Sequence, residues 1–193
     1  MSSPVPLSLR RKVVIALDAE QVAPATAITE PESQTQGRFL AFKTVAWCKA
    51  NLVRPSHDHI FLVTSIDPSI GVFDNGVLSA MWSSLNGTED PHANRAKDAE
   101  AGLRRLAASL HDCGVSCTIE VLRGPPAETV AEYVHVHHGE LLALQVVVRS
   151  AAAMAVSYSW TELCARKAEC PTVLVKTSDL PENIGSALDP SPS

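Results

Sequence analysis

Two groups of histidines are spaced in a way that could ligate a metal ion. His135 and His138 are three residues apart, and His57 and His59 flank Asp58. Neither group has a third ligand at a suitable spacing. Histidine near the C-terminus of a helix is favoured by the helix dipole without any metal. We therefore expect no metal site, with His135 and His138 ending a helix and residues 57–59 forming a polar turn.

The cysteines and the motif content give no positive support for an enzyme. The five cysteines are Cys48, Cys113, Cys117, Cys164 and Cys170, and no two of them form a Cys-x-x-Cys motif. An odd number of cysteines, with no export signal, predicts reduced, buried or half-buried thiols in a cytoplasmic protein. No nucleophile elbow, no Gly-x-x-x-x-Gly-Lys motif and no paired catalytic carboxylates are present. We assign no catalytic residue.

The segment VVVRSAAAMAVSYSWTELCARKAECPTVLV (146–175) raises the question of anion binding. It runs from a buried strand through a loop into a helix, which is where many α/β proteins hold phosphates. Glycine allows the backbone to approach a phosphate closely, but this loop contains none. Arg149 could supply a positive charge instead, since guanidinium pairs well with phosphate. A solvated or structurally paired arginine is the alternative that we favour.

These residues lie within an alternating pattern of strands and helices. Apolar, β-branched runs predict strands, and stripes at helical spacing predict helices between them. This order is typical of an α/β, doubly wound parallel sheet of five strands with helices on both faces. The expected strands are 11–18, 59–66, 117–124, 142–150 and 171–177, and the expected helices are 38–53, 88–112, 126–138 and 157–167.

Composition limits the classes of partner. The chain has 193 residues and a net charge of −5, and its basic residues are scattered, so we expect no nucleic-acid surface. No apolar run is long enough to cross a membrane. We expect a flexible N-terminus (1–10, with Arg10-Arg11-Lys12 as a solvated flank), one domain (11–177) and a disordered tail (178–193). Residues 19–37 and 67–87 are expected to be long loops.

Ligands of such sheets bind beyond the carboxyl ends of the strands. Asp18, Gly124, Arg149 and Ser150 follow or end expected strands and should therefore lie at one rim. Asp18 is a candidate contact for a ligand, although an aspartate at the end of a strand also caps loops. Gly124 is expected to serve a turn that faces the same crevice.

Four segments resemble the universal stress protein family. These are VVIALD, GVSCTIEVLRGPPAETVAEYV (114–134), LQVVVRS and SYSWTELCARKAECPTVLVK (157–176), and the resemblance spans about residues 11–177. It implies the adenine-nucleotide alpha-hydrolase-like fold, with strand order 3-2-1-4-5. The departures fall mainly at 19–37 and 67–87.

Many members of that family bind ATP through Gly-x-x-Gly, nine residues, and Gly-Ser or Gly-Thr. The resemblance places Arg149 and Ala152 at the first two glycines, and of the signature only Ser159 matches. The loop is also shorter by four residues than the signature requires. We therefore expect no bound cofactor and a domain that binds ATP weakly or not at all. The alternatives are ATP or AMP held by Asp18, Arg149 and Ser159, or a hydrolase with 19–37 as a lid.

The resemblance also implies a homodimer. Members of the family commonly pair through the last strand, which here is apolar and expected at the edge of the sheet. Pairing there would bury Val173 and Val175. A monomer whose tail covers this edge is the alternative. The protein would then act as a stress-response or interaction module, and the sequence does not identify its partners.

Overall fold

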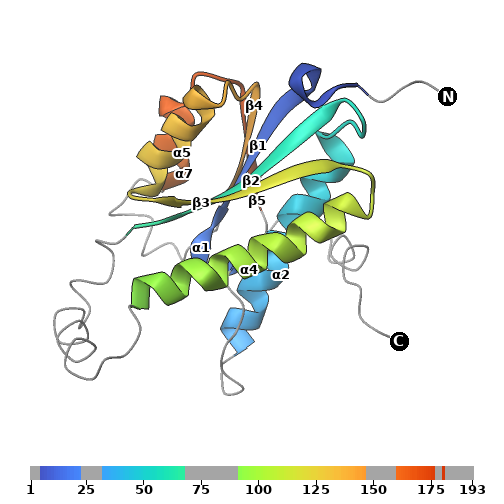
Figure 1. Ribbon diagram of the computed structural model, residues 1–193. Coiled ribbons are helices and arrows are strands. Elements are labelled where there is room, and N and C mark those ends of the chain that lie inside the picture. The colour runs from blue at the N-terminus through green and yellow to red at the C-terminus, as the bar shows by residue number, and fades with distance from the viewer. Residues whose placement is uncertain (1–4, 23–31, 68–90, 147–159, 177–179, 181–193) are drawn as a thin grey trace, which may run out of the picture.

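The computed structural model describes residues 5–22, 32–67, 91–146, 160–176 and 180, which form a single twisted sheet covered by helices (Figure 1). All four strand pairings are parallel, and the strand order is β3-β2-β1-β4-β5. Both the predicted fold class and the predicted order are confirmed. The strands are β1 (Arg11–Asp18), β2 (Asp58–Ile66), β3 (Ser116–Arg123), β4 (Leu141–Val146) and β5 (Thr172–Lys176).

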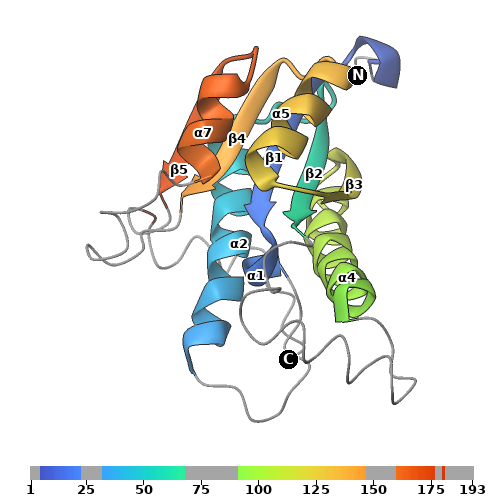
Figure 2. The same ribbon diagram turned by 90° about the vertical axis from the view of Figure 1, so that its left-hand side faces the viewer.

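Helices cover both faces of the sheet (Figures 1 and 2). One face carries α1 (Ala19–Val22), α2 (Glu32–Asn51) and α4 (Pro91–His111), and the other carries α5 (Pro126–Val136) and α7 (Trp160–Lys167). A short 3-10 helix, η1 (Leu7–Leu9), precedes β1. α5 begins with Pro126 in its first turn, where the missing N–H has no helical partner in any case.

The sheet separates two apolar cores, because successive residues of a strand point to opposite faces. In β1, Ile15 packs with Leu62 and Leu103 on the α2–α4 side. Val14 packs with Val130 on the α5–α7 side. Residues 13–16 of β1 are fully buried, which explains why this strand reads as one continuous apolar run.

The structure corrects the prediction for residues 19–37. Ala19–Val22 is helical, and α2 begins at Glu32 instead of residue 38. The start of α2, ESQTQG, carries no apolar residue that would reveal helical periodicity, so the sequence pattern placed the start too late. Residues 23–31, like the 67–87 segment beyond Asp67, lie outside the described residues.

The position of α1 depends on Gly102 in α4. A Cβ atom added at Gly102 would lie 1.8 Å from the carbonyl oxygen of Val22, far inside contact distance. Any other residue at position 102 would push the two helices apart. α1 is therefore held directly against α4 by a close approach of the backbones.

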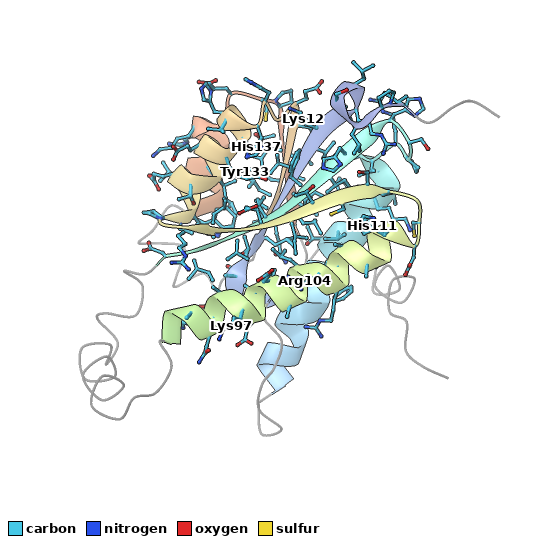
Figure 3. The ribbon with its side chains drawn as sticks, in the orientation of Figure 1. Lys12, Lys97, Arg104, His111, Tyr133 and His137 are labelled. Carbon is cyan, nitrogen blue, oxygen red and sulfur yellow. The ribbon has the colours of Figure 1, made fainter. Side chains whose placement is uncertain are left out.

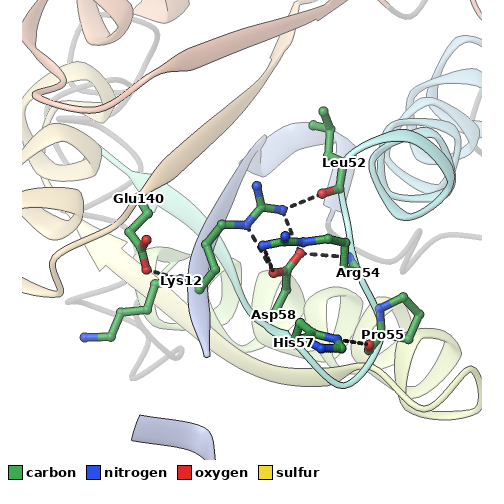
Figure 4. A network of polar contacts seen from close by, with 8 residues as sticks. Lys12, Leu52, Arg54, Pro55, His57, Asp58 and Glu140 are labelled. Atoms are coloured by element: carbon green, nitrogen blue, oxygen red, sulfur yellow. Dashed lines mark hydrogen bonds and ion pairs between the residues drawn. The ribbon is translucent and has the colours of Figure 1, made fainter. Parts of the chain in front are cut away.

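A buried ion pair ties the start of β1 to the start of β2 (Figure 4). The Asp58 carboxylate is fully buried and accepts hydrogen bonds from Arg11 Nη2 at 2.6 Å and Nε at 3.1 Å. It also accepts one from the backbone N–H of Arg54 at 2.7 Å. The predictions of a polar turn at 57–59 and of a solvated flank at 10–12 are therefore wrong for Asp58 and Arg11. The register between two strands brings these residues together, and local composition does not reveal it.

β5 is an edge strand, as predicted, but its side chains divide between the core and the surface. Val173 and Val175 both pack on the α2 side, and Val175 is only 2% exposed within its own chain. Leu174 points to the other face and is 46% exposed. Leu180, the one described residue of the predicted tail, packs against the same core as Val173. The side chain that remains open at this edge is Leu174.

Candidate functional site

A cavity of about 270 Å³ lies beyond the carboxyl ends of β1 and β2. Asp18 ends β1 and is paired in register with Ser65 of β2, so both residues reach the same rim. The direction in which the chain crosses the sheet changes between β1 and β4, next to this rim, and ligands of such sheets bind at that switch point. The described residues that line the cavity are Leu17, Asp18, Ala19, Glu20, Ser65, Ile66, Asp67, Arg95, Asp98, Pro126, Val130 and Trp160.

Asp18 both lines this cavity and caps the turn into α1. Its Oδ1 accepts a hydrogen bond from the backbone N–H of Glu20 at 3.0 Å. Its own backbone N–H donates to Oε1 of Gln145 at 3.4 Å. Asp18 can therefore both cap this turn and contact a ligand, the two roles that the sequence left open. A carboxylate held in this way presents a fixed acceptor to the cavity.

A buried pair of glutamines, Gln21 and Gln145, lies next to Asp18, whose backbone N–H donates to Gln145. The Nε2 group of Gln145 in β4 donates to Oε1 of Gln21 in α1, and Gln145 is fully buried. Buried amides cost free energy unless they are paired, so this contact fixes α1 against β4. Neither glutamine was predicted from the sequence to belong to the site. A glutamine inside the apolar run LLALQVVV was the available signal.

Gly124 shapes the neighbouring turn, as predicted. Its φ of 128° is rarely adopted by a residue with a side chain, and its N–H donates to the Ile66 carbonyl at 3.0 Å. The Ser65 hydroxyl donates to the Gly124 carbonyl at 2.8 Å. A Cβ at Gly124 would lie 2.8 Å from Cγ2 of Thr129. Gly124 thus positions the start of α5, whose Pro126 and Val130 face the cavity.

The described lining of the cavity is strongly acidic. It includes the carboxyl groups of Asp18, Glu20, Asp67 and Asp98, and a single guanidinium, that of Arg95. Carboxylates this close to a bound polyphosphate would repel it, by an energy that grows as water is excluded. The cavity also has an apolar wall, formed in part by Trp160. The described part of this site therefore suits an uncharged or weakly anionic group better than a triphosphate.

The structure brings together only some of the predicted site residues. Asp18 and Gly124 lie at the expected rim, whereas Arg149, Ser150 and Ser159 fall outside the described residues. Arg95, Asp98 and Trp160 were not predicted to belong to the site. They come from α4 and α7, which reach the rim only when the helices pack on the sheet.

Two of the histidines, His59 and His137, instead belong to an aromatic and polar cluster on the α5 side of β2. His137 stacks on Tyr133 with ring centroids 4.1 Å apart, and Figure 3 shows the two side by side at the C-terminal end of α5. His59 lies within hydrogen-bond distance of the hydroxyls of Ser116 (2.6 Å) and Thr118 (2.9 Å). Burial lowers the pKa of His59, and nearby cationic groups lower it further.

Neither histidine group forms a metal centre in the part of the chain that the structure describes. No cluster of three or more potential ligands occurs there. His135 lies 2.9 Å from the carboxylate of Glu169, and both side chains are exposed. His135, one of the two histidines considered as a pair of metal ligands, therefore contacts a carboxylate from the segment after α7.

The model of the universal stress protein family matches residues 41–176, and the chain belongs to this family. Universal stress protein UspA from Lactobacillus plantarum has the same fold, with a TM-score of 0.56 and 14% sequence identity over 86% of this chain and 97% of that one. The hypothetical protein MJ0577 superposes with a TM-score of 0.54 and 13% identity, over 87% of this chain and 96% of that one. No curated protein matches the sequence at a significant level.

A third solved structure carries a ligand. It is a universal stress protein family protein from Arabidopsis thaliana with AMP bound, 16% identical, with a TM-score of 0.50 over 90% of this chain and 98% of that one. At these identities the solved structures establish the fold alone. Within the described residues, no helix has the combination of length and apolar character that would let it cross a membrane.

Proposed function

We propose that this protein is a cytoplasmic universal stress protein that acts as a dimeric binding module and does not hold ATP tightly. The observation that carries the proposal is the acidic crevice, in which four carboxylates and one guanidinium line the described rim. The glycine-free loop at 147–159 supports it from the sequence, because side chains there obstruct a backbone cradle for phosphates.

Isothermal titration with ATP and Mg²⁺ tests this proposal. We expect a dissociation constant weaker than about 100 μM, equivalent to less than about 5.5 kcal/mol of binding free energy. The double variant Asp67→Asn, Asp98→Asn should bind ATP at least a few-fold more tightly at low salt, since it removes two charges that repel phosphate. Glu100→Gln removes a carboxylate from α4 outside the cavity lining and is the matched control. Low-micromolar binding of ATP by the wild type would contradict the proposal.

A second candidate is a site for AMP or a nucleoside. The cavity has the fixed Asp18 acceptor and the apolar wall of Trp160 and Val130 that a base or ribose would need. The family protein from Arabidopsis thaliana was solved with AMP bound, which makes AMP the natural probe.

Titration with AMP and adenosine distinguishes this candidate from the first. Asp18→Asn should weaken adenosine binding at least about tenfold, because the loss of one charged hydrogen bond costs about 1.5–3 kcal/mol. Glu100→Gln should leave it unchanged. Equal affinity in wild type and Asp18→Asn, or no heat for either ligand, would reject this candidate.

The dimer that we propose pairs β5 with β5 of a second copy, antiparallel across a two-fold axis. An unpaired edge strand offers backbone N–H and C=O groups to another chain. Leu174 on this edge is 46% exposed, and Leu163 of the neighbouring α7 is 40% exposed. Figure 2 shows α7 beside β5 at the outer limit of the sheet. A second copy would cover both leucines.

Analytical ultracentrifugation tests this interface. Leu174→Lys should convert a dimer to a monomer, because it places a charge at an apolar contact on the strand edge. Leu9→Lys is the matched control, since Leu9 lies in η1 and is even more exposed, at 74%. Equal sedimentation of the wild type and Leu174→Lys would count against this interface. Val173→Lys is a less specific test, because Val173 packs in the core of its own chain.

A further inference from the structure

An ammonium group and a thiol meet on the surface at the end of the molecule opposite the crevice. Lys49 lies in the last turn of α2, and Cys113 lies in the turn between α4 and β3. Lys49 Nζ and Cys113 Sγ are 2.6 Å apart, although 64 residues separate them in the chain. Cys113 is exposed, contrary to the expectation of a buried or half-buried thiol.

The separation of 2.6 Å is too short for a hydrogen bond to sulfur. N–H···O bonds have a typical nitrogen-to-oxygen distance of about 2.9 Å, and sulfur is larger than oxygen. The separation is also much longer than a direct nitrogen–sulfur bond. It is the spacing that a single light atom bonded to both groups would give.

We propose that Lys49 and Cys113 are a modification site at which peroxide forms a covalent N–O–S cross-link between the two side chains. The reactive partner is hydrogen peroxide or an organic hydroperoxide. The exposed position of Cys113 gives the oxidant access to its sulfur, and the Lys49 nitrogen lies close enough to react with the oxidised sulfur group.

The other thiols are poor competitors for the oxidant. Burial raises the pKa of Cys48, Cys117 and Cys164 to about 12. Burial also raises the pKa of Cys170. Oxidation selects accessible cysteines, so it should begin at the exposed Cys113.

The chemistry balances with two equivalents of peroxide. In the first step the thiolate sulfur of Cys113 attacks one peroxide oxygen, the O–O bond breaks, and sulfenic acid and water form after proton uptake. In the second step, Lys49 loses a proton, and its amine nitrogen is oxidised by two electrons as it bonds to the sulfenic oxygen. The second peroxide accepts those electrons and leaves as two molecules of water. The product is Cys–S–O–NH–Lys.

The link would join α2 to the turn before β3 and so close a long loop of the chain. A cross-link of this kind stabilises a protein chiefly by restricting its unfolded state. For a domain of this size, we expect the melting temperature to rise by about 5–10 °C after oxidation. Ligand binding at the crevice should not change, because the link lies at the amino ends of the strands.

Peptide mass mapping of the full chain before and after treatment with hydrogen peroxide tests the proposal. We expect one cross-linked peptide pair that contains Lys49 and Cys113 and carries one added oxygen and two fewer hydrogens. Dithiothreitol should release the pair and reverse the shift in melting temperature. Lys49→Gln and Cys113→Ser should each abolish both effects, and Cys170→Ser, the matched control, should keep them.

Three results would overturn the proposal. The first is Cys113 oxidised to sulfenic or sulfinic acid while Lys49 stays unmodified. The second is a cross-link at a different lysine or cysteine. The third is a thermal shift of equal size in Lys49→Gln, which would show that oxidation stabilises the protein without this bond.

Discussion

Replacing Asp58 by asparagine should destabilise the protein more than any surface substitution of equal size. The carboxylate of Asp58 is fully buried, whereas the side chain of Arg11 is 27% exposed and that of Arg54 is 62% exposed. Asparagine keeps an oxygen that can accept the N–H of Arg54, but it removes the charge opposite the Arg11 guanidinium. The loss therefore falls on the Arg11 contacts at 2.6 and 3.1 Å.

The magnitude follows from the burial of the two partners. Breaking a fully buried ion pair costs about 3–5 kcal/mol, because one charge is left without compensation. Arg11 can recover part of its hydration, so we expect Asp58→Asn to lower the free energy of unfolding by about 3 kcal/mol. For a chain of this length, that loss corresponds to a fall in melting temperature of about 6–12 °C.

Urea denaturation at several pH values measures this effect. Burial tends to raise the pKa of Asp58, but the hydrogen bonds and charges of Arg11 and Arg54 outweigh it and hold the pKa below its ordinary value. The stabilising contribution should therefore be complete above about pH 4 and disappear as the pH falls through the folded-state pKa.

The control is Glu100→Gln, which breaks an exposed ion pair within α4. We expect it to cost less than about 0.5 kcal/mol. A loss below about 1 kcal/mol for Asp58→Asn, or a difference from wild type that persists unchanged below pH 3, would refute the reasoning.

Two further substitutions test the packing of α1 and the histidine cluster. Gly102→Ala should lower the free energy of unfolding by about 2–3 kcal/mol, because its Cβ would meet the Val22 carbonyl. At an exposed helical site the same change stabilises a protein by about 1 kcal/mol. A higher free energy of unfolding for Gly102→Ala in denaturation would therefore refute the contact. Ala101→Gly, on the exposed side of α4, is its control and should cost about 1 kcal/mol. Because the pKa of His59 is lowered, wild type should lose stability as the pH falls from about 6.5 through the folded-state pKa, by less than about 1 kcal/mol for a half-buried ring. Denaturation of wild type and His59→Gln at pH 7.5 and 5.5 should show this loss of stability in the wild type alone. An equal change in the free energy of unfolding of the two proteins would contradict the assignment to His59.

The fold class could be predicted because the strands of a parallel sheet are buried on both faces. Such strands read as short apolar runs, and residues 13–17 of β1 are all buried. Helix boundaries were less accurate where the chain carries no apolar marker. The first turns of α2 contain only polar residues and glycine, so the sequence there shows no apolar residues at helical spacing.

Contacts between distant residues could not be predicted from local composition. Arg11 and Asp58 read as a charged flank and a polar turn, and strand register brings them together across 47 positions. Lys49 and Cys113 are separated by 64 positions and show no shared motif. Their proximity depends on how α2 and the α4–β3 turn end at the same side of the sheet.

The sequence by itself determined the order of strands and helices, the membership in a family, and the loss of glycine from the 147–159 loop. It also placed Asp18 and Gly124 at one rim, because parallel strands all end at the same side. Only the tertiary structure decided that Arg95 and Asp98 join that rim from α4. The physical reason is that a sequence records which face of a helix is apolar, whereas the partners of its polar side chains depend on how the helix docks.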